Sequence, residues 1–115
     1  MAKKLVRAIH INVVNRTVTE VEIEPTLSKY YELLGCDCYT LATRYDNGDG
    51  VLVDDEGLLK PQHTFFTVRG GHQPFAGNGI VLGTTRNGNE THVKSSIADL
   101  DVKFHSVDEV RAMYR

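Results

Sequence analysis

The histidines are the first residues to consider, because an imidazole can bind a metal or transfer a proton near neutral pH. The five histidines of this 115-residue chain are His10, His63, His72, His92 and His105. No two of them have the spacing of a short metal motif such as His-x-x-x-His. One class of phosphodiesterase uses paired His-x-Ser/Thr units as acid and base, but none of these histidines has a hydroxyl residue two positions later. Strand or loop positions therefore fit them better than catalytic ones.

Two acidic segments have the composition of turns. Residues 46–50 (Asp-Asn-Gly-Asp-Gly) superficially resemble a calcium loop, but the loop frame would place Tyr45 where the first carboxylate is needed. Residues 54–57 (Asp-Asp-Glu-Gly) suit a turn between short strands. We therefore predict two turns, and neither a calcium site nor a two-metal hydrolase.

Nucleophiles have no recognisable support. Cys36 and Cys38 lie two residues apart in an extended segment, where their side chains point to opposite faces, so we expect two reduced thiols. A Gly-x-Ser-x-Gly elbow and a Gly-x-x-x-x-Gly-Lys-Ser/Thr phosphate loop are both missing from the sequence. We expect a protein that is not an enzyme and that needs no cofactor or metal.

The segment from Arg69 to Gly83 is the most unusual part of the chain. Four glycines precede Ile80 here, and they surround a cation, an aromatic ring and an amide. Glycine lets a backbone approach a ligand and present its N–H groups to an anion. Under this interpretation Arg69 binds phosphate, Phe75 stacks on a base and Asn78 contacts a base edge. The alternative is a loop plus a glycine-rich strand whose missing side chains make room for the helix.

Hydrophobic periodicity predicts the elements that position these residues. Alternating residues at 5–14 and 18–24 predict a hairpin, and Leu27, Tyr30, Tyr31 and Leu34 follow a helical period over residues 25–34. Pro25 suits the first helical turn and Gly35 the end of the helix. Further strands are predicted at 38–45, 51–53, 63–69 and 76–85, a helical turn at 96–100, an extended segment at 101–105 and a helix at 107–115. The fold class is α+β, with a mostly antiparallel sheet, an N-terminal hairpin, one helix after it and a short C-terminal helix.

Composition sets the broad class. We expect one domain over residues 1–115, because this length and 41% hydrophobic residues suit a single core. The net charge of -2 argues against duplex nucleic acid as a partner, since that partner usually requires a basic face. Apolar runs are too short to span a membrane, and Arg7 and His10 interrupt the first one, so we expect a mature protein in a cytoplasm.

Several short motifs resemble a family of small proteins encoded by phages and plasmids and known as a domain of unknown function. The motifs are residues 23–25, the helix end at 34–35, residues 53–58 and residues 75–83. The family has a Leu-Pro-x-Asn-like segment where this chain has residues 59–63, with His63 in place of the asparagine. The resemblance covers roughly residues 20 to 105.

The resemblance implies a function in immune evasion. Some similar phage proteins are sponges that sequester the cyclic oligonucleotide signals of antiphage defence of the CBASS type without cleaving them. It implies a homo-oligomer, dimer or tetramer, in the host cytoplasm, with a cyclic dinucleotide held between protomers. Stacking surfaces, cations and amides are the groups that such a ligand needs.

The candidate ligand-binding residues follow from this reading. Phosphate candidates are Arg44, Lys60 and Arg69, stacking candidates are Tyr39 and Phe75, and base- or ribose-edge candidates are His63, His72 and Asn78. The main alternative is a protein–protein module that inhibits or regulates a host enzyme. A phosphodiesterase is the remaining alternative, although the missing acid–base pairs disfavour it.

Overall fold

A computed structural model describes residues 5–56, 64–71, 73–85 and 87–113, and the strands among them form two antiparallel sheets. The main sheet has the strand order β2-β1-β7-β4-β3, and β8 pairs with β7 beside this path. The small sheet has the order β6-β5-β9. The strands are β1 Val6–Asn12, β2 Thr17–Ile23, β3 Tyr39–Arg44, β4 Gly50–Asp54, β5 Thr64–Thr67, β6 Phe75–Ala76, β7 Gly79–Thr84, β8 Glu90–Thr91 and β9 Lys103–Ser106.

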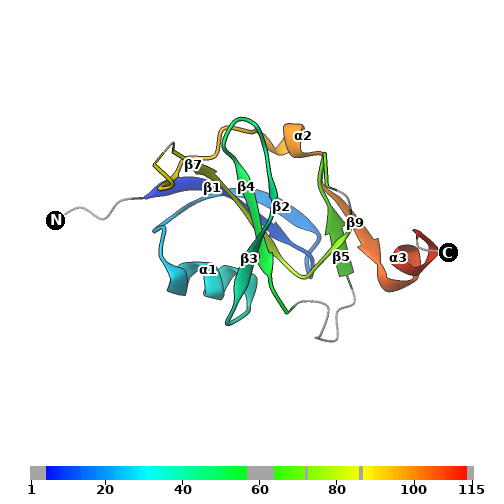
Figure 1. Cartoon of the computed structure of the whole chain (residues 1–115). Coiled ribbons are helices and arrows are strands. Elements are labelled where there is room, and N and C mark those ends of the chain that lie inside the picture. Colours follow the sequence, from blue (N-terminus) through cyan, green and yellow to red (C-terminus); the bar gives the residue numbers. More distant parts are fainter. Residues whose placement is uncertain (1–4, 57–63, 72, 86, 114–115) are drawn as a thin grey trace.

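The three helices are α1 Leu27–Leu34, α2 Ile97–Leu100 and α3 Val107–Met113. Figure 1 shows α1 on one face of the main sheet, with the small sheet and α3 at the end of the molecule away from the N-terminus. The chain is elongated, with principal extents of 51 × 27 × 23 Å. The predicted α+β class, the N-terminal hairpin, the following helix and the short C-terminal helix are confirmed.

Both faces of the central strands are covered. On β1, Val6 and Ala8 face α1 and pack with Tyr30 and Leu34 of that helix. On the opposite face, Ile9 and Ile11 pack in a second core. This core also contains Phe66, Val68, Phe75, Val93 and Leu100. This double burial explains why the central strands carry apolar residues on both parities.

The caps of α1 differ in one respect from the prediction. Thr26 has extended backbone angles and accepts a hydrogen bond from the Lys29 N–H, so the cap is Thr26 and Pro25 lies before the helix. Gly35 ends the helix in the left-handed conformation with φ 66°, as predicted, and donates its N–H to the Tyr31 carbonyl.

The glycine-rich segment is a structural feature of the core. The predicted strand over residues 76–85 is divided into β6 and β7 by Gly77, which has a φ of 86°. Gly79 lies directly under the ring of Phe66, and a Cβ at this position would be 2.6 Å from the Phe66 Cζ. Gly79 therefore has a packing role, although it makes room for Phe66 of β5 and not for the predicted helix, and Gly77 provides the bend between β6 and β7.

Replacing Gly79 by alanine is expected to lower the free energy of unfolding by about 1–3 kcal/mol, because the fully buried Phe66 ring has no space to withdraw. Urea denaturation followed by circular dichroism measures this loss. Phe66→Leu removes the atoms in conflict. In that background Gly79→Ala should therefore lower the free energy of unfolding by less than it does in the wild type. Equal costs in the two backgrounds would contradict this packing account.

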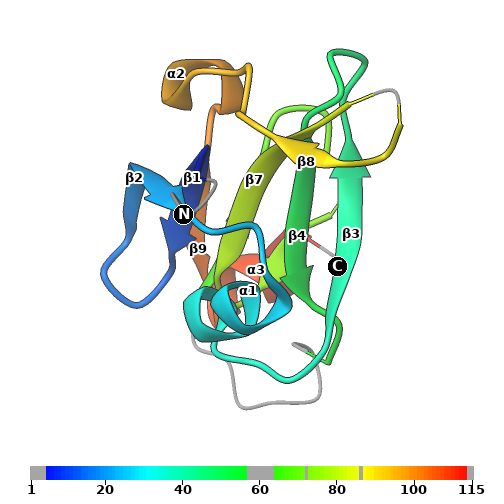
Figure 2. The same cartoon turned by 90° about the vertical axis from the view of Figure 1, so that its left-hand side faces the viewer.

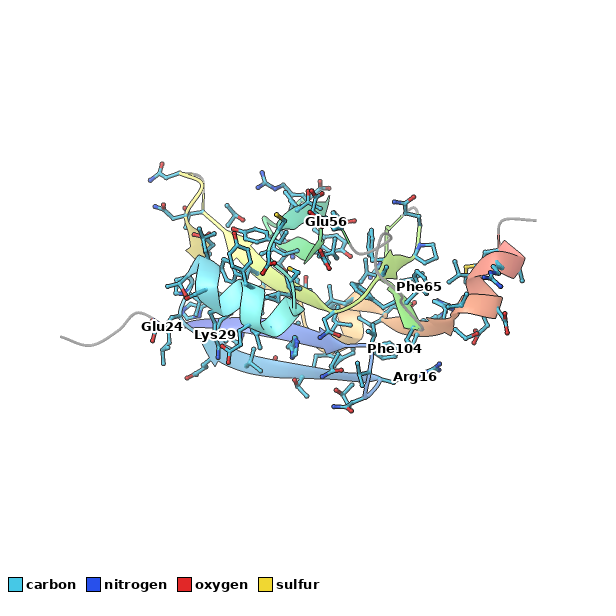
Figure 3. All side chains as sticks on the ribbon, turned by 90° about the horizontal axis from the view of Figure 1, so that it is seen from below. Arg16, Glu24, Lys29, Glu56, Phe65 and Phe104 are labelled. Carbon is cyan, nitrogen blue, oxygen red and sulfur yellow. The ribbon has the colours of Figure 1, made fainter. Side chains whose placement is uncertain are left out.

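Phe65 and Phe66 point to opposite faces of β5, as their adjacency in a strand requires. Phe66 lies in the main core, and Phe65 is 9% exposed on the other face, where α3 packs against β5 and β9. Figure 3 shows Phe65 and Phe104 in this end of the molecule, away from α1. The outward phenylalanine is thus covered by a second layer of the same chain.

The first turn of α3 is held by the predicted capping box. Ser106 Oγ accepts from the Glu109 N–H at 3.2 Å, and a Glu109 carboxylate oxygen accepts from the Ser106 N–H at 3.3 Å. His105 Nδ1 lies 3.7 Å from the same carboxylate, and its Nε2 is 3.0 Å from Thr67 Oγ1 on β5. The Ser106 hydrogen bonds, chiefly, lower the pKa of Glu109.

Acid should therefore loosen α3. A carboxylate with a lowered folded-state pKa contributes stability above its unfolded pKa of about 4.3, and loses it as the pH falls through the folded value. Below this range we expect the backbone chemical shifts of α3 to move toward coil values while those of β1 do not. In Glu109→Gln the movement of the α3 shifts toward coil values should be absent in this window, because the residue at position 109 no longer titrates. An unchanged pH profile in that variant would contradict the assignment.

Candidate functional site

The end of the main sheet beyond α1 carries an open hollow. Helix α1 packs against β7 and β3 but covers only part of the sheet face, as seen where β3, β4, β7 and β8 extend past the helix in Figure 2. A cavity of about 190 Å³ lies on the uncovered part. We call it the sheet hollow, and its lining residues are Tyr39, Leu41, Arg44, Gly50, Leu52, Leu82, Thr84, Gly88 and Glu90.

Strand register places these residues on one face. Leu41 is paired with Leu52, Gly50 with both Leu82 and Arg44, and Glu90 with Thr84. Gly50 has no side chain, so Leu41 from the edge strand leans over it, and a Cβ there would be 2.6 Å from Leu41 Cδ1. The result is an apolar floor between a cation on β3 and a carboxylate on β8.

A second depression adjoins the sheet hollow at the end of the strands. It has a volume of about 340 Å³ and shares Arg44 and Thr84 with the hollow, and Gly48, Thr85 and Lys94 extend its lining. The Lys94 ammonium donates to the Asn47 carbonyl at 2.9 Å, which holds this cation near the β3–β4 turn. Two cations and two threonine hydroxyls at one rim are groups that bind a phosphate, and the Asp46 carboxylate lines the same depression.

Asp49 fixes the position of this rim. Its carboxylate is fully buried and accepts from the N–H groups of Lys94 at 2.9 Å and Ser95 at 2.7 Å. The Asn47 amide adds a hydrogen bond at 3.3 Å. The predicted turn at residues 46–50 is therefore present, and its second aspartate ties the segment after β8 to the β3–β4 turn. Within the described residues, no group of three or more His, Cys, Asp and Glu side chains could hold a metal ion.

Tyr39 forms the wall of the sheet hollow next to α1. Its ring contacts Tyr30 edge to face at a centroid distance of 5.6 Å and Tyr31 at 5.8 Å. Burial, followed by the nearby Glu90 carboxylate, raises the pKa of Tyr39, so the phenol remains a neutral donor at physiological pH. The half-buried ring is held by the helix and turned toward the hollow by the strand.

The sequence-predicted residues separate into groups. Tyr39 and Arg44 line the sheet hollow together. Arg69 lies elsewhere, in a depression of about 390 Å³ with Tyr45 and Asp99, and its carbonyl accepts from the Tyr45 hydroxyl at 2.6 Å. Three further candidates, Lys60, His63 and His72, lie outside the described residues.

Two candidates have structural roles that replace the predicted ones. Phe75 is 8% exposed and its ring packs 5.4 Å from that of Phe66, so it offers no face for stacking on a base. Asn78 accepts from the Val13 N–H at 3.0 Å and donates to the Leu33 carbonyl at 3.2 Å. Its amide connects the residue after β1 to the end of α1, and both its oxygen and its nitrogen have partners within the chain.

Sequence reasoning missed Glu90, Lys94 and the two threonines. The threonines precede the predicted turn at residues 87–89, and Glu90 and Lys94 follow it, but none of them belongs to a recognisable motif. The pairing of Glu90 with Thr84 could have been expected from that turn. The position of Lys94 depends on the hydrogen bonds of Asp49, which is 45 residues earlier in the chain.

Comparison with known proteins gives a family match over most of the chain. Residues 6–105 match the model of a domain of unknown function, DUF3846. Neither a curated protein nor a solved structure matches the chain. Across the described part of the chain, helices long and apolar enough to cross a membrane are not found.

Proposed function

The chain belongs to the DUF3846 family, and we propose that it is a phage immune-evasion protein that binds a cyclic dinucleotide defence signal and sequesters it intact. The observation that carries this proposal is the sheet hollow, where an aromatic wall, an apolar floor and a cation meet. In this proposal Tyr39 and Arg44, and not the glycine-rich segment, bind the ligand.

The chemistry of the two depressions suits the parts of a cyclic dinucleotide. A base can lie on Leu52 and Leu82 against the wall formed by Tyr39, since flat apolar surfaces bind any base face. A phosphate can lie at the rim between Arg44 and Lys94, where charge-assisted hydrogen bonds form. Thr84, which lines both depressions, can donate to either.

Sequestration without cleavage agrees with the side chains at the hollow. Among the described residues that line the two depressions, Glu90 and Asp46 are the carboxylates and there is no histidine. Cleavage of a phosphodiester needs a positioned base together with a second group that protonates the leaving oxygen. Tight binding alone is sufficient for a sponge, and a Kd near 10 nM corresponds to about -11 kcal/mol.

A second copy of the chain would complete the site. The sheet hollow is smaller than the roughly 300–1,000 Å³ of a pocket that encloses a ligand of drug size. It opens beside β3, an edge strand on which Leu41 is 45% exposed. A homo-oligomer in which another protomer covers this side would close the pocket around the ligand. The same exposed edge favours the alternative function, a module that binds and inhibits a host enzyme.

Isothermal titration calorimetry with a panel of cyclic dinucleotides tests the proposal, and we expect binding with a submicromolar Kd. Sedimentation of the complex should show two or four protomers. Denaturing the complex and analysing the released ligand by mass spectrometry should return the intact ring. No heat of binding at micromolar concentrations would exclude the sponge, and recovery of a linear product would assign an enzyme.

A further inference from the structure

The far side of the sheet hollow from Arg44 is formed by Glu90. Its pairing with Thr84 directs its side chain to the α1 face of the sheet, where the carboxylate lines the hollow. Arg44 lies on β3 and Glu90 on β8, so β7 and β4 separate them. Three strand spacings give roughly 14 Å between the two backbones, and both side chains extend into the space between. A ligand that fills the hollow therefore meets a cation at one end and a carboxylate at the other.

The buried hydroxyl of Tyr30 lies close to this carboxylate. Tyr30 is 1% exposed, and its hydroxyl has no hydrogen-bond partner among the described residues. Burial raises the pKa of Tyr30 well above its usual value, and the charge of Glu90 raises it further, so the hydroxyl keeps its proton beside the carboxylate. Buried donors are almost always satisfied in folded proteins. The Glu90 carboxylate, whose charge acts on this hydroxyl, is the acceptor beside it, so Tyr30 can hold the carboxylate from behind.

The base that this end fits is one with two adjacent N–H donors. A carboxylate is an acceptor with about four lone-pair positions, so it can accept from a ligand in addition to its contacts within the chain. Guanine presents N1–H and N2–H₂ side by side on its Watson–Crick edge, and both can point at one carboxylate. Adenine presents one amino group next to a ring nitrogen that is itself an acceptor. That nitrogen would face the carboxylate, so binding would leave two hydrogen-bond acceptors opposite each other without water or a donor between them.

We propose that Glu90 makes the sheet hollow selective for guanine, with the base lying along Tyr39 and its phosphate directed toward Arg44. This inference rests on the proposed nucleotide-binding function and adds the identity of the base. Glu90 would contact the base directly, whereas Tyr30 would position the carboxylate from behind.

Calorimetry with cyclic di-GMP, cyclic di-AMP, GMP and AMP tests the selectivity. The wild-type chain should bind each guanine ligand roughly ten- to hundredfold more tightly than its adenine counterpart, the range expected for hydrogen bonds to a charged group. Glu90→Gln keeps the size and loses one acceptor and the charge, so it should weaken guanine binding by a similar factor. It should also strengthen adenine binding, because the amide can donate to the ring nitrogen of adenine and accept from its amino group. Glu20→Gln, an exposed carboxylate on β2, is the matched control and should change neither.

The possible results distinguish a failure of the guanine selectivity from a failure of the proposed nucleotide binding. Binding of guanine and adenine ligands with equal affinity, unchanged by Glu90→Gln, would overturn the role of Glu90 and leave nucleotide binding in place. Preference for adenine would do the same. Absence of binding by all four ligands would overturn both proposals. The unfolding temperature of Glu90→Gln should equal that of the wild type, and this control distinguishes a loss of guanine affinity from unfolding of the variant.

Discussion

Replacing Arg44 by glutamine is expected to weaken cyclic dinucleotide binding by roughly ten- to hundredfold. Arg44 is exposed on β3, lines both depressions, and makes no ion pair with another described residue. Its guanidinium can therefore give its hydrogen bonds to a phosphate without breaking a contact in the fold. Glutamine keeps part of the aliphatic stem and removes the charge, so the loss reports on the phosphate contact.

Arg69→Gln is the matched control for this experiment. Arg69 is also exposed, and it belongs to the separate depression next to Tyr45 and Asp99. Its side chain can be changed while its backbone contacts with Tyr45 and Leu100 remain. Calorimetry should give wild-type affinity for this variant and unfolding temperatures within a few degrees for both. If Arg69→Gln abolished binding while Arg44→Gln did not, the site would have to be moved to the glycine-rich segment.

Asp49→Ala should lower the free energy of unfolding by about 3–5 kcal/mol, a large fraction of the stability of a small domain. The carboxylate is fully buried, and its removal leaves the N–H groups of Lys94 and Ser95 without an acceptor. The Asn47 amide loses the same partner. Since these bonds connect segments 45 residues apart, the loss also frees the segment that carries Lys94.

Urea denaturation measures this cost, with a lower midpoint and an unchanged slope expected. Asp49→Asn keeps one oxygen acceptor and should lose less than the alanine variant. Asp46→Ala, an exposed aspartate in the same turn, should stay within about 0.5 kcal/mol of the wild type. An Asp49→Ala variant as stable as the wild type would show that the buried carboxylate does not hold the two segments together.

Local patterns predicted the elements whose signals lie within a few residues. The hairpin follows from alternation, α1 from the spacing of its apolar residues, and α3 from the Ser106 and Glu109 pair. The division of the predicted strand at residues 76–85 was not predictable in this way. It depends on the left-handed Gly77 and on hydrogen bonds of Asn78 to Val13 and Leu33, which are distant in sequence.

Local patterns also limited the prediction of the candidate site, and they identified only some of its lining residues. Tyr39 and Arg44 lie on one strand, so a single segment of sequence contained both. Phe75 and Asn78 were misassigned because aromatic and amide side chains near glycine suit a ligand site and a tight core equally well. Glu90 reaches the sheet hollow through the β7–β8 pairing, and Lys94 reaches the adjoining depression through the hydrogen bonds of Asp49. Neither position is visible in a local sequence pattern.

Mapping of backbone amide shifts by NMR during titration with cyclic di-GMP is the most direct test of the binding site. The sheet hollow predicts that the largest changes fall on β3, β4, the end of β7 and the segment from Glu90 to Lys94, with Arg44→Gln removing them at the same ligand concentration. Changes confined to Arg69 and the residues up to Gly79, or spectra that do not change at millimolar ligand, would contradict a nucleotide site on this face of the sheet.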